Sequence, residues 1–328
     1  MKQVTQHHFK APWWAKSPHV QTILPVMTKV TMPTLERQRL ELSDGDFIDL
    51  DWLRKPTENQ SIVLMLHGLE GSAKSHYIRR MLQTCKQHHQ AAVVHHHRSC
   101  SGEANRLARS YHSGDTQDLQ HTLITLKRQF PSSPILVVGY SLGGNVLTKY
   151  LGEKQSEALI ERAVVISAPL RLDACAEKLE KGFSKVYQKH LINQLQYKTR
   201  EKVSHPRLGQ HMPVTAKQVT QLNSFYKFDH QVTAPLNGFT GVDDYYQRAS
   251  GLPYLSQICV PTLVMHARDD PFMTDAVIPT ATQISDTVEY ELHHQGGHVG
   301  FIDGGTPLKP RYYLERRIYN FLTGESPC

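Results

Sequence analysis

The chain has 328 residues, of which 39% are hydrophobic, and it carries a formal net charge of +7 at pH 7. That length suits one large α/β domain with an insertion, or two domains. No apolar run reaches the roughly 20 residues that a membrane-spanning helix needs, and the opening residues MKQVTQHHFKAPWW lack the apolar stretch of a secretory signal, so we predict a cytoplasmic protein.

The first half of the chain alternates short apolar runs with helical stretches. Residues 37–54 alternate on both sides of Asp44-Gly45, which predicts a β-hairpin with a tight turn. The pattern then predicts strands at 61–68, 91–97, 134–141 and 162–169, with helices at 75–90, 115–130 and 142–153 between them. Continuous apolar strands with helices between them are typical of a parallel sheet covered on both faces.

The alternation stops between about Leu170 and Leu252, in a helical, charged and aromatic stretch. Strand patterns return in 261–272 and 287–298, and an amphipathic helix is predicted at 311–322. We therefore predict a core made of residues 1–169 and 253–328. Residues 170–252 are expected to form a helical cap inserted over the carboxyl edge of the sheet.

One serine lies at the tightest point of the sequence. Ser141 stands between Gly139 and Gly143, directly after a predicted strand and directly before a predicted helix. Gly-x-Ser-x-Gly in that setting is typical of a nucleophile elbow, where the absent side chains let strand and helix approach closely. The alternative is a glycine-rich loop with an incidental serine. We favour a nucleophile, since the helix N-terminus also favours developing negative charge.

A serine nucleophile needs a base and an acid, which we expect downstream in the order serine, acid, histidine. His298 follows the last predicted strand, after two glycines. Asp269 and Asp270 end the preceding strand, and the Pro271 that follows favours Asp270 as the acid and Asp269 as a cap of the turn. The predicted catalytic residues are therefore Ser141, Asp270 and His298.

The negative charge that forms on a reacting carbonyl oxygen needs backbone donors. One is expected from the amide of Leu142, the residue after the nucleophile. The other is expected from Leu69, because His67-Gly68 ends an early strand and would turn the next amide toward the site.

Two other residue types bear on cofactors. His95 and His97 would share one face of a strand and could hold a zinc ion, but no third ligand is evident, so we predict neither a metal nor an organic cofactor. The five cysteines are scattered and include no Cys-x-x-Cys, which favours buried reduced thiols.

The basic surface has a plain interpretation. Lysine and arginine cluster modestly in EKLEKGFSKVYQKH and QYKTREK, with acidic residues mixed into both stretches. A solvated basic face is the simplest interpretation, and we expect no specific nucleic-acid binding. Weak association with a membrane surface and the oligomeric state stay open.

Several segments together resemble the YheT-like family of α/β-hydrolases. They are PHVQTILP, LHGLEGS, HHRSCSGEANR, YHSGDTQDL, GYSLGGNVLTKYLGE, TAPLNGF, DYYQRAS, and ARDDPF through GGHVGF, in the family's order and over almost the whole chain. The resemblance implies an α/β-hydrolase fold and a serine hydrolase triad at Ser141, Asp270 and His298. The family's Arg-Gly-Cys-Ser-Gly stands here as Arg98 to Gly102 with Ser99 in place of the first glycine.

The expected activity is hydrolysis of a small-molecule carboxylic ester, short to medium in acyl chain or lipid-like, through an acyl-enzyme. Two alternatives stay open. An alcohol O-acyltransferase would use the same residues, and a non-catalytic binding protein would keep only the fold.

Overall fold

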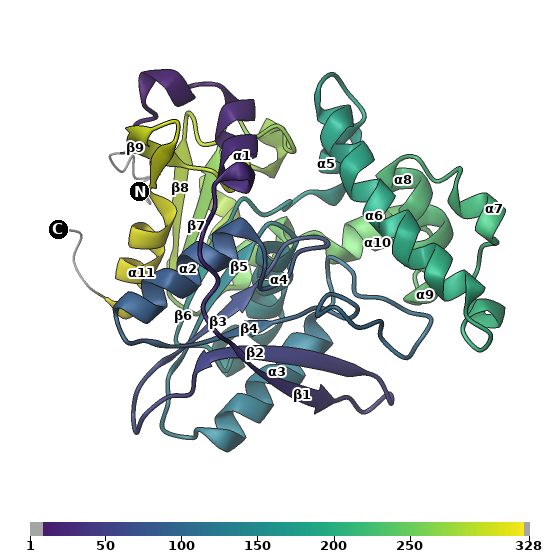
Figure 1. Ribbon diagram of the computed structural model, residues 1–328, viewed down its shortest axis with the longest axis horizontal. Helices are drawn as coiled ribbons and strands as arrows, with labels where there is room; N and C mark the ends of the chain where they lie inside the picture. The colour runs from purple at the N-terminus through teal and green to yellow at the C-terminus, as the bar shows by residue number, and fades with distance from the viewer. Residues whose placement is uncertain (1–8, 325–328) are drawn as a thin grey trace.

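The computed structural model describes residues 9–324, and a sheet of eight strands runs through its centre (Figure 1). The strand order is β1-β2-β4-β3-β5-β6-β7-β8. β2 is antiparallel to both β1 and β4, and all pairs from β4 to β8 are parallel. The predicted mostly parallel sheet and the predicted hairpin at Asp44-Gly45 are both confirmed. The strands are β1 (Glu36–Glu41), β2 (Phe47–Arg54), β3 (Ile62–Leu66), β4 (Ala91–His95), β5 (Ile135–Tyr140), β6 (Arg162–Ile166), β7 (Thr262–Ala267) and β8 (Val288–His293).

The apolar strands supply two separate cores, one on each face of the sheet. Alternate residues of a strand point to opposite faces, so Leu64 of β3 packs into one core and its neighbours Val63 and Met65 pack into the other. α3 (Thr116–Gln129) and α4 (Leu142–Lys154) cover the first core, and α2 (His76–Gln87) and α11 (Leu314–Thr323) cover the second. Burial on both faces explains why these strands are continuously apolar.

The end of the chain differs from the prediction at one point. The helix expected from residue 311 begins at Leu314, because Lys309–Tyr312 forms β10 and pairs with β9 (Ile302–Thr306) in a separate hairpin. The predicted helix therefore starts three residues too early.

A helical segment joins β6 to β7, and from residue 170 to residue 252 the structure assigns no strand. Its helices build small apolar clusters of their own and lie together beyond one side of the sheet, at the right of Figure 1. They are α5 (Leu172–Leu179), α6 (Ser184–Ser204), α7 (Ala216–Val219), α8 (Phe225–Phe228), α9 (Ala234–Leu236) and α10 (Val242–Ala249), with a π-helical turn, η4 (Asp229–Thr233), between α8 and α9.

One long helix and several short ones were not predicted. α1 (Pro18–Met27) contains Pro25, and a proline inside a helical pattern normally argues against a helix. The 3₁₀ turns are η1 (Trp13–Ala15), η2 (Gln155–Glu157), η3 (Gly209–His211), η5 (Leu252–Gln257), η6 (Asp275–Val277) and η7 (Ala281–Gln283).

The cysteine prediction is partly wrong. Cys85, Cys100 and Cys175 are buried free thiols, but Cys259 is exposed. Cys328 and residues 1–8, which belong to the N-terminal stretch analysed above, lie outside the described residues. In the described part of the chain, no helix has both the length and the apolar character that crossing a bilayer requires.

Candidate active site

Ser141 occupies a sharp turn between β5 and α4. Its φ of 52° is positive, a conformation that costs energy for a residue other than glycine. A Cβ on Gly139 would lie 2.5 Å from the carbonyl oxygen of Gly143, and a Cβ on Gly143 would lie 2.6 Å from the carbonyl oxygens of Leu66 and His67. Both glycines are therefore required by close backbone contacts, as the sequence pattern predicts.

The hydroxyl of Ser141 is hydrogen-bonded to an imidazole that comes from the other end of the chain. The distance from His298 Nε2 to Ser141 Oγ is 3.0 Å, and the distance from His298 Nδ1 to Asp270 Oδ2 is 2.8 Å. The ring of Phe272 stacks on the imidazole at 4.0 Å with an interplanar angle of 4°. The carboxylate therefore orients the imidazole so that Nε2 faces the serine oxygen.

The contacts of the two aspartates that follow β7 differ from our expectation. Asp270 is fully buried at its side chain and accepts the backbone N–H of Phe272 at 2.8 Å, so it holds the turn as well as the imidazole. Asp269 was expected to cap that turn, but its Oδ1 accepts the N–H of Gly297 at 2.9 Å. Burial raises the pKa of Asp269 to about 6.

α1 braces the loop that carries His298, a role that the sequence alone did not predict. Thr22 Oγ1 accepts the N–H of His298 at 3.0 Å. The buried amide of Gln21 donates to the carbonyl oxygen of Ile302 at 3.1 Å and accepts the N–H of Ile302 at 2.7 Å. The segment PHVQTILP contains both residues, so its presence among the family segments was the available signal.

The loop after β3 has its amides fixed on both sides of Leu69. The hydroxyl of Tyr77 accepts the N–H of Gly68 at 3.0 Å, and the hydroxyl of Tyr111 accepts the N–H of Glu70 at 2.7 Å. On the other side, the N–H of Leu142 belongs to the first turn of α4, where amides have no carbonyl partner within the helix. Both residues predicted as oxyanion donors, Leu69 and Leu142, line the same cavity as Ser141 and His298.

Glu70 connects this loop to the helical segment. Its carboxylate, 3% exposed, accepts a hydrogen bond from Tyr111 Oη at 2.8 Å and lies 2.7 Å from Lys198 Nζ on α6. Glu70 itself has a φ of 53°. A positive φ in a residue other than glycine persists only where its surroundings hold it, and the ion pair and the tyrosine supply those contacts.

The histidines near the end of β4 support the same loop and make no metal site. His97 donates its Nε2–H to the carbonyl oxygen of His67 at 3.1 Å, and His67 donates its Nδ1–H to the carbonyl oxygen of Gly68 at 2.8 Å. Burial lowers the pKa of His67 well below its usual value and that of His97 to about 4, so both rings are neutral at neutral pH. His95 bonds Thr122 instead. Across residues 9–324, no group of three or more histidine, cysteine, aspartate or glutamate side chains is arranged to hold a metal ion.

The departure at Ser99 also has a structural reason. Ser99 has a φ of 64°, in the left-handed region that favours the glycine found in the family segment. Its hydroxyl donates to Asn105 Oδ1 at 2.5 Å and accepts the N–H of Asn105 at 3.1 Å. These two bonds hold the serine in a conformation that glycine adopts without cost.

An apolar cavity of about 140 Å³ extends from Ser141 and His298 between the sheet and the helical segment. Its apolar wall includes Leu69, Leu142, Leu172, Leu179, Leu191, Leu195, Met212, Phe225, Phe228, Val232, Leu236, Phe272 and Met273. Among the aromatic residues of the helical segment, Phe225, Phe228, Tyr245 and Tyr246 line this cavity, whereas Tyr226 is 47% exposed.

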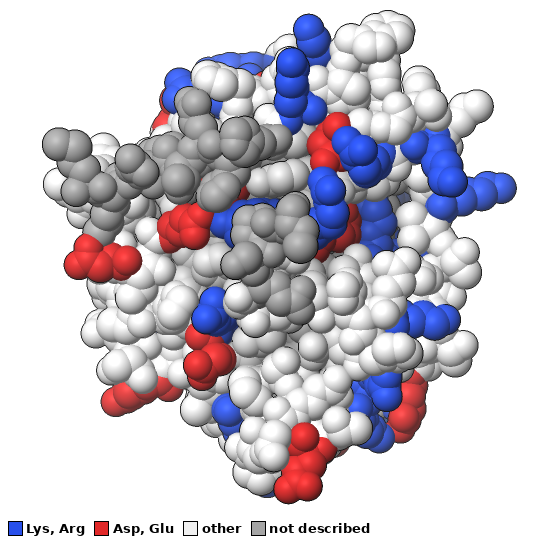
Figure 2. All heavy atoms as spheres, turned by 90° about the vertical axis from the view of Figure 1, so that its left-hand side faces the viewer, with Lys and Arg blue, Asp and Glu red and all other residues white. Residues whose placement is uncertain are grey.

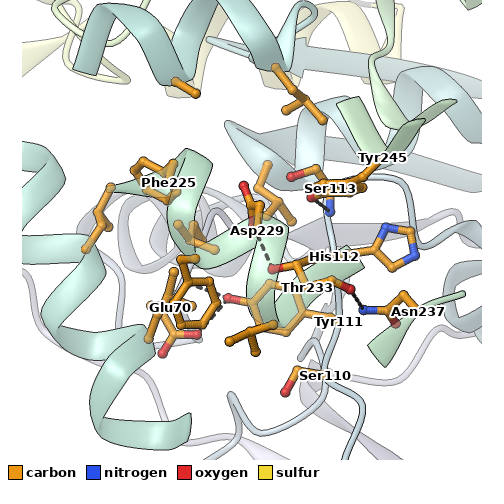
Figure 3. A pocket seen from close by; sticks show the side chains of 18 of the residues that line it. Glu70, Ser110, Tyr111, His112, Ser113, Phe225, Asp229, Thr233, Asn237 and Tyr245 are labelled. Atoms are coloured by element: carbon orange, nitrogen blue, oxygen red, sulfur yellow. Dashed lines mark hydrogen bonds between the residues drawn. The ribbon is translucent and has the colours of Figure 1, made fainter. Parts of the chain in front are cut away.

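Several polar side chains in this cavity have partners within the protein (Figure 3). Asp229 accepts hydrogen bonds from Thr233 Oγ1 at 2.6 Å and from Tyr246 Oη at 2.9 Å, and burial raises its pKa to about 6. Tyr245 Oη accepts the N–H of Ser113 at 3.0 Å. Lys202 donates to the carbonyl oxygen of Arg109 at 2.9 Å. Asn237 Oδ1, also in the lining, has no partner among residues 9–324, but a cavity whose walls are mainly apolar suits an apolar ligand.

Comparison with known proteins identifies the family of the chain. Residues 61–305 match the family described as the alpha/beta hydrolase fold. The chain is 42% identical over 309 residues to the Escherichia coli (strain K12) protein named "Putative esterase YheT", covering 93% of this chain and 90% of that protein. It is 27% identical to human "Phospholipase ABHD3", covering 97% and 79% of the two chains. The solved structure of the Pyrococcus furiosus esterase Pf2001 superposes with a TM-score of 0.56 at 17% identity, covering 99% and 98%.

The resemblance found in the sequence is thereby confirmed. The matched region includes the serine turn, the Asp270 turn and the His298 loop, and the superposition on a solved esterase structure supports the same overall fold. The chain belongs to the α/β-hydrolase fold family, as a YheT-like member.

Proposed function

We propose that the protein hydrolyses carboxylic esters with an apolar acyl chain, using Ser141, His298 and Asp270. The observation that carries the proposal is the continuous hydrogen-bonded chain from Ser141 Oγ through His298 to Asp270, at 3.0 Å and 2.8 Å. A base within hydrogen-bond reach of a hydroxyl, itself oriented by a carboxylate, is the arrangement that activates a serine nucleophile. The names of the relatives, an esterase and a phospholipase, support the same chemistry.

In the proposed reaction, Ser141 Oγ attacks the acyl carbonyl carbon while His298 Nε2 takes the hydroxyl proton. The carbonyl oxygen becomes an anion and accepts hydrogen bonds from the amides of Leu69 and Leu142. His298 then gives its proton to the leaving alcohol as the carbon–oxygen bond breaks. Water repeats these steps on the acyl-enzyme, which releases the carboxylic acid and restores the serine.

We propose that residues 170–252 act as a cap over the site, with residues 1–169 and 253–328 as the hydrolase core. The support is the cavity, because α5, α6, α8 and η4 supply much of its apolar wall. A wall of that kind would bury the acyl chain and leave the polar alcohol part less enclosed.

Enlarging one side chain in this wall tests whether the cavity binds the acyl chain. Leu195 on α6 is half-buried and lines the cavity. In Leu195→Phe, the larger ring should fill the cavity and reduce kcat/KM for octanoyl and longer p-nitrophenyl esters about tenfold or more. The acetyl ester should change less than about threefold, since its acyl chain ends near Ser141. Rates are measured over a series of acyl lengths.

Ile124→Phe is the matched control, because Ile124 is 41% exposed on α3 and lies outside the cavity. It should leave every ester unchanged. An equal loss for all acyl lengths in Leu195→Phe would contradict the assignment of this cavity to the acyl chain.

The ion pair between Glu70 and Lys198 should influence turnover more than substrate binding. In Glu70→Gln, Tyr111 can still donate its hydrogen bond, but Lys198 loses its charged partner and the turn at Leu69 loosens. We expect kcat to fall about tenfold with KM changed less than twofold, since an oxyanion donor acts mainly in the transition state. Lys198→Met should have a similar effect, and the double variant should lose little more.

Glu153→Gln provides the comparison, because it breaks the pair of Glu153 with Lys149 on the far end of α4. That change should leave kcat and KM as they are. If Glu70→Gln raises KM and leaves kcat intact, Glu70 does not position the donor at Leu69.

A further inference from the structure

We propose that α1 and the beginning of α6 form a surface that docks on an anionic phospholipid bilayer. The surface, called here the α1–α6 face, consists of apolar side chains on both helices and of lysines around them: Ile23, Val26, Met27, Phe183, Val186, Lys16, Lys29, Lys181, Lys185 and Lys189. The proposal concerns binding and does not depend on the proposed hydrolysis. The lysines of the α1–α6 face can be seen in the sequence, but the surface that they share with the apolar side chains appears only in the structure.

Exposed apolar side chains concentrate in two segments, residues 9–35 and 181–200. Across residues 9–324, eleven large hydrophobic side chains are exposed, and eight of them lie in these segments. On the face itself, Met27 is 73% exposed, Val26 61% and Val186 56%. Single exposed hydrophobic residues are common, but a concentration of this kind usually marks an interaction surface.

Contacts between the two helices make the face continuous. The rings of His19 and Phe183 lie 4.3 Å apart, and His19 Nδ1 is hydrogen-bonded to Tyr187 Oη at 2.9 Å. Residues three and four apart share one side of a helix, so Ile23 lies next to His19 along α1, and Val26 and Met27 extend the same row. Val186 on α6 is likewise one turn from Phe183, the residue that precedes this helix.

The charge of both segments has a single sign. Residues 9–35 and 181–200 contain eight lysines and arginines and no aspartate or glutamate, although the whole chain has 30 acidic residues. The acidic residues noted near this cluster in the sequence, Glu177, Glu180 and Glu201, lie outside its ends, and Glu177 pairs with Lys181. Figure 2 shows the side of the molecule that is turned away from α6, where acidic and basic side chains are both present.

The face adjoins the proposed catalytic residues. Tyr187 contacts the ring of Phe272 at 5.0 Å, and Phe272 stacks on His298 at 4.0 Å. Docking at this face would therefore place the bilayer beside the seam between α1 and α6, behind which Ser141 and His298 lie. A substrate with an apolar acyl chain resides in such a bilayer.

The mixture of side chains favours a bilayer over two other occupants. Lysines around aliphatic and aromatic side chains are typical of surfaces that lie in the membrane interface, where cations meet lipid phosphates and apolar groups enter the acyl boundary. Nucleic-acid backbones would satisfy the lysines but leave the aliphatic side chains in water. A second copy of this face would bring like charges together.

Vesicle sedimentation tests the proposal with the full chain. The wild-type protein should bind vesicles of phosphatidylcholine that contain about one-third phosphatidylglycerol, and it should bind pure phosphatidylcholine vesicles at least about tenfold more weakly. Lys181→Glu, Lys185→Glu and Lys189→Glu combined should reduce binding to the anionic vesicles about tenfold or more. Val26→Ser with Met27→Ser should also weaken it, because those side chains enter the acyl boundary.

Two control variants have the same composition change elsewhere. Lys86→Glu, Lys217→Glu and Lys309→Glu alter three other exposed lysines, and Ile124→Ser with Leu308→Ser alters two other exposed apolar residues. Both should bind vesicles like the wild type. All variants should unfold at a temperature close to that of the wild type, which shows that they fold. They should also hydrolyse a water-soluble acetyl ester as the wild type does, which separates this test from that of the proposed function.

Equal binding of the two triple lysine variants would overturn the proposal. So would wild-type binding that ignores the phosphatidylglycerol. If Val26→Ser with Met27→Ser leaves vesicle binding intact, and the wild type prefers DNA to the vesicles, the face binds nucleic acid and not a bilayer.

Discussion

Ser141→Ala is expected to lower kcat for p-nitrophenyl acetate by about 10⁴- to 10⁶-fold, the loss measured when a serine nucleophile is removed from other triads. The substitution deletes one oxygen atom and leaves the turn between Gly139 and Gly143 in place. Initial rates of ester cleavage measure the effect, and a thermal unfolding curve close to that of the wild type shows that the fold persists. A fluorophosphonate probe should label the wild type and leave this variant unlabelled.

Ser167→Ala is the matched control for that experiment. Ser167 also follows a parallel strand, β6, has a positive φ of 48°, and is buried. Its hydroxyl accepts the N–H of Val299 and contacts the loop of His298 only through the backbone. A loss below about tenfold is expected there. Cleavage and labelling that survive in Ser141→Ala would remove this residue from the mechanism.

Asp270→Asn is expected to lower kcat by about 10⁴-fold. An asparagine at this position keeps the shape of the side chain and the hydrogen bond from the N–H of Phe272. However, it cannot stabilise the imidazolium that forms when His298 takes the serine proton, and it permits the wrong tautomer. The rate of p-nitrophenyl acetate cleavage at pH 8 measures the loss.

Asp269→Asn makes the same chemical change one residue earlier and should reduce kcat less than about tenfold, because Asp269 contacts the backbone of Gly297 and not the imidazole. A larger loss in Asp269→Asn than in Asp270→Asn would assign the acid to Asp269.

The stability of Asp269→Asn should depend on pH in a defined direction. Burial raises the pKa of Asp269 to about 6 from a usual value near 3.8. The folded state therefore holds this proton more tightly than the unfolded state, and the wild type loses stability as the pH rises from about 4 to about 6. Relative to the wild type, the variant should unfold at a higher temperature at pH 8 and at a similar temperature at pH 4. Thermal unfolding at both pH values decides this.

The parts of the fold that sequence patterns predicted are those that local chemistry determines. Strands buried on both faces must be apolar throughout, and the turn at Ser141 needs glycine on each side. The parallel sheet and the serine turn could therefore both be predicted from the sequence. α1 was not predictable, because Pro25 argues against a helix. Tertiary contacts stabilise this helix. Gln21 and Thr22 hold it against a loop almost 280 residues later in the chain.

The candidate site likewise has a part that the sequence predicts and a part that depends on tertiary contacts. The order serine, acid, histidine and the position of each after a strand were sufficient to select Ser141, Asp270 and His298 among 20 histidines and 30 acidic residues. The partners of Leu69 were not predictable, because Tyr111 and Lys198 reach Glu70 from two distant segments. Asp269 was assigned to the wrong contact for the same reason, since its partner belongs to the histidine loop.

Gly143 contacts more than the strand that precedes it. A Cβ there would meet the carbonyl oxygens of Leu66 and His67 at 2.6 Å, which belong to β3 and to the start of the loop that carries Leu69. The missing methyl group therefore sets the spacing between the Ser141 hydroxyl and the loop that carries the Leu69 amide. Alanine at this one position would force the two segments apart, although each group in the proposed mechanism would keep its own chemistry.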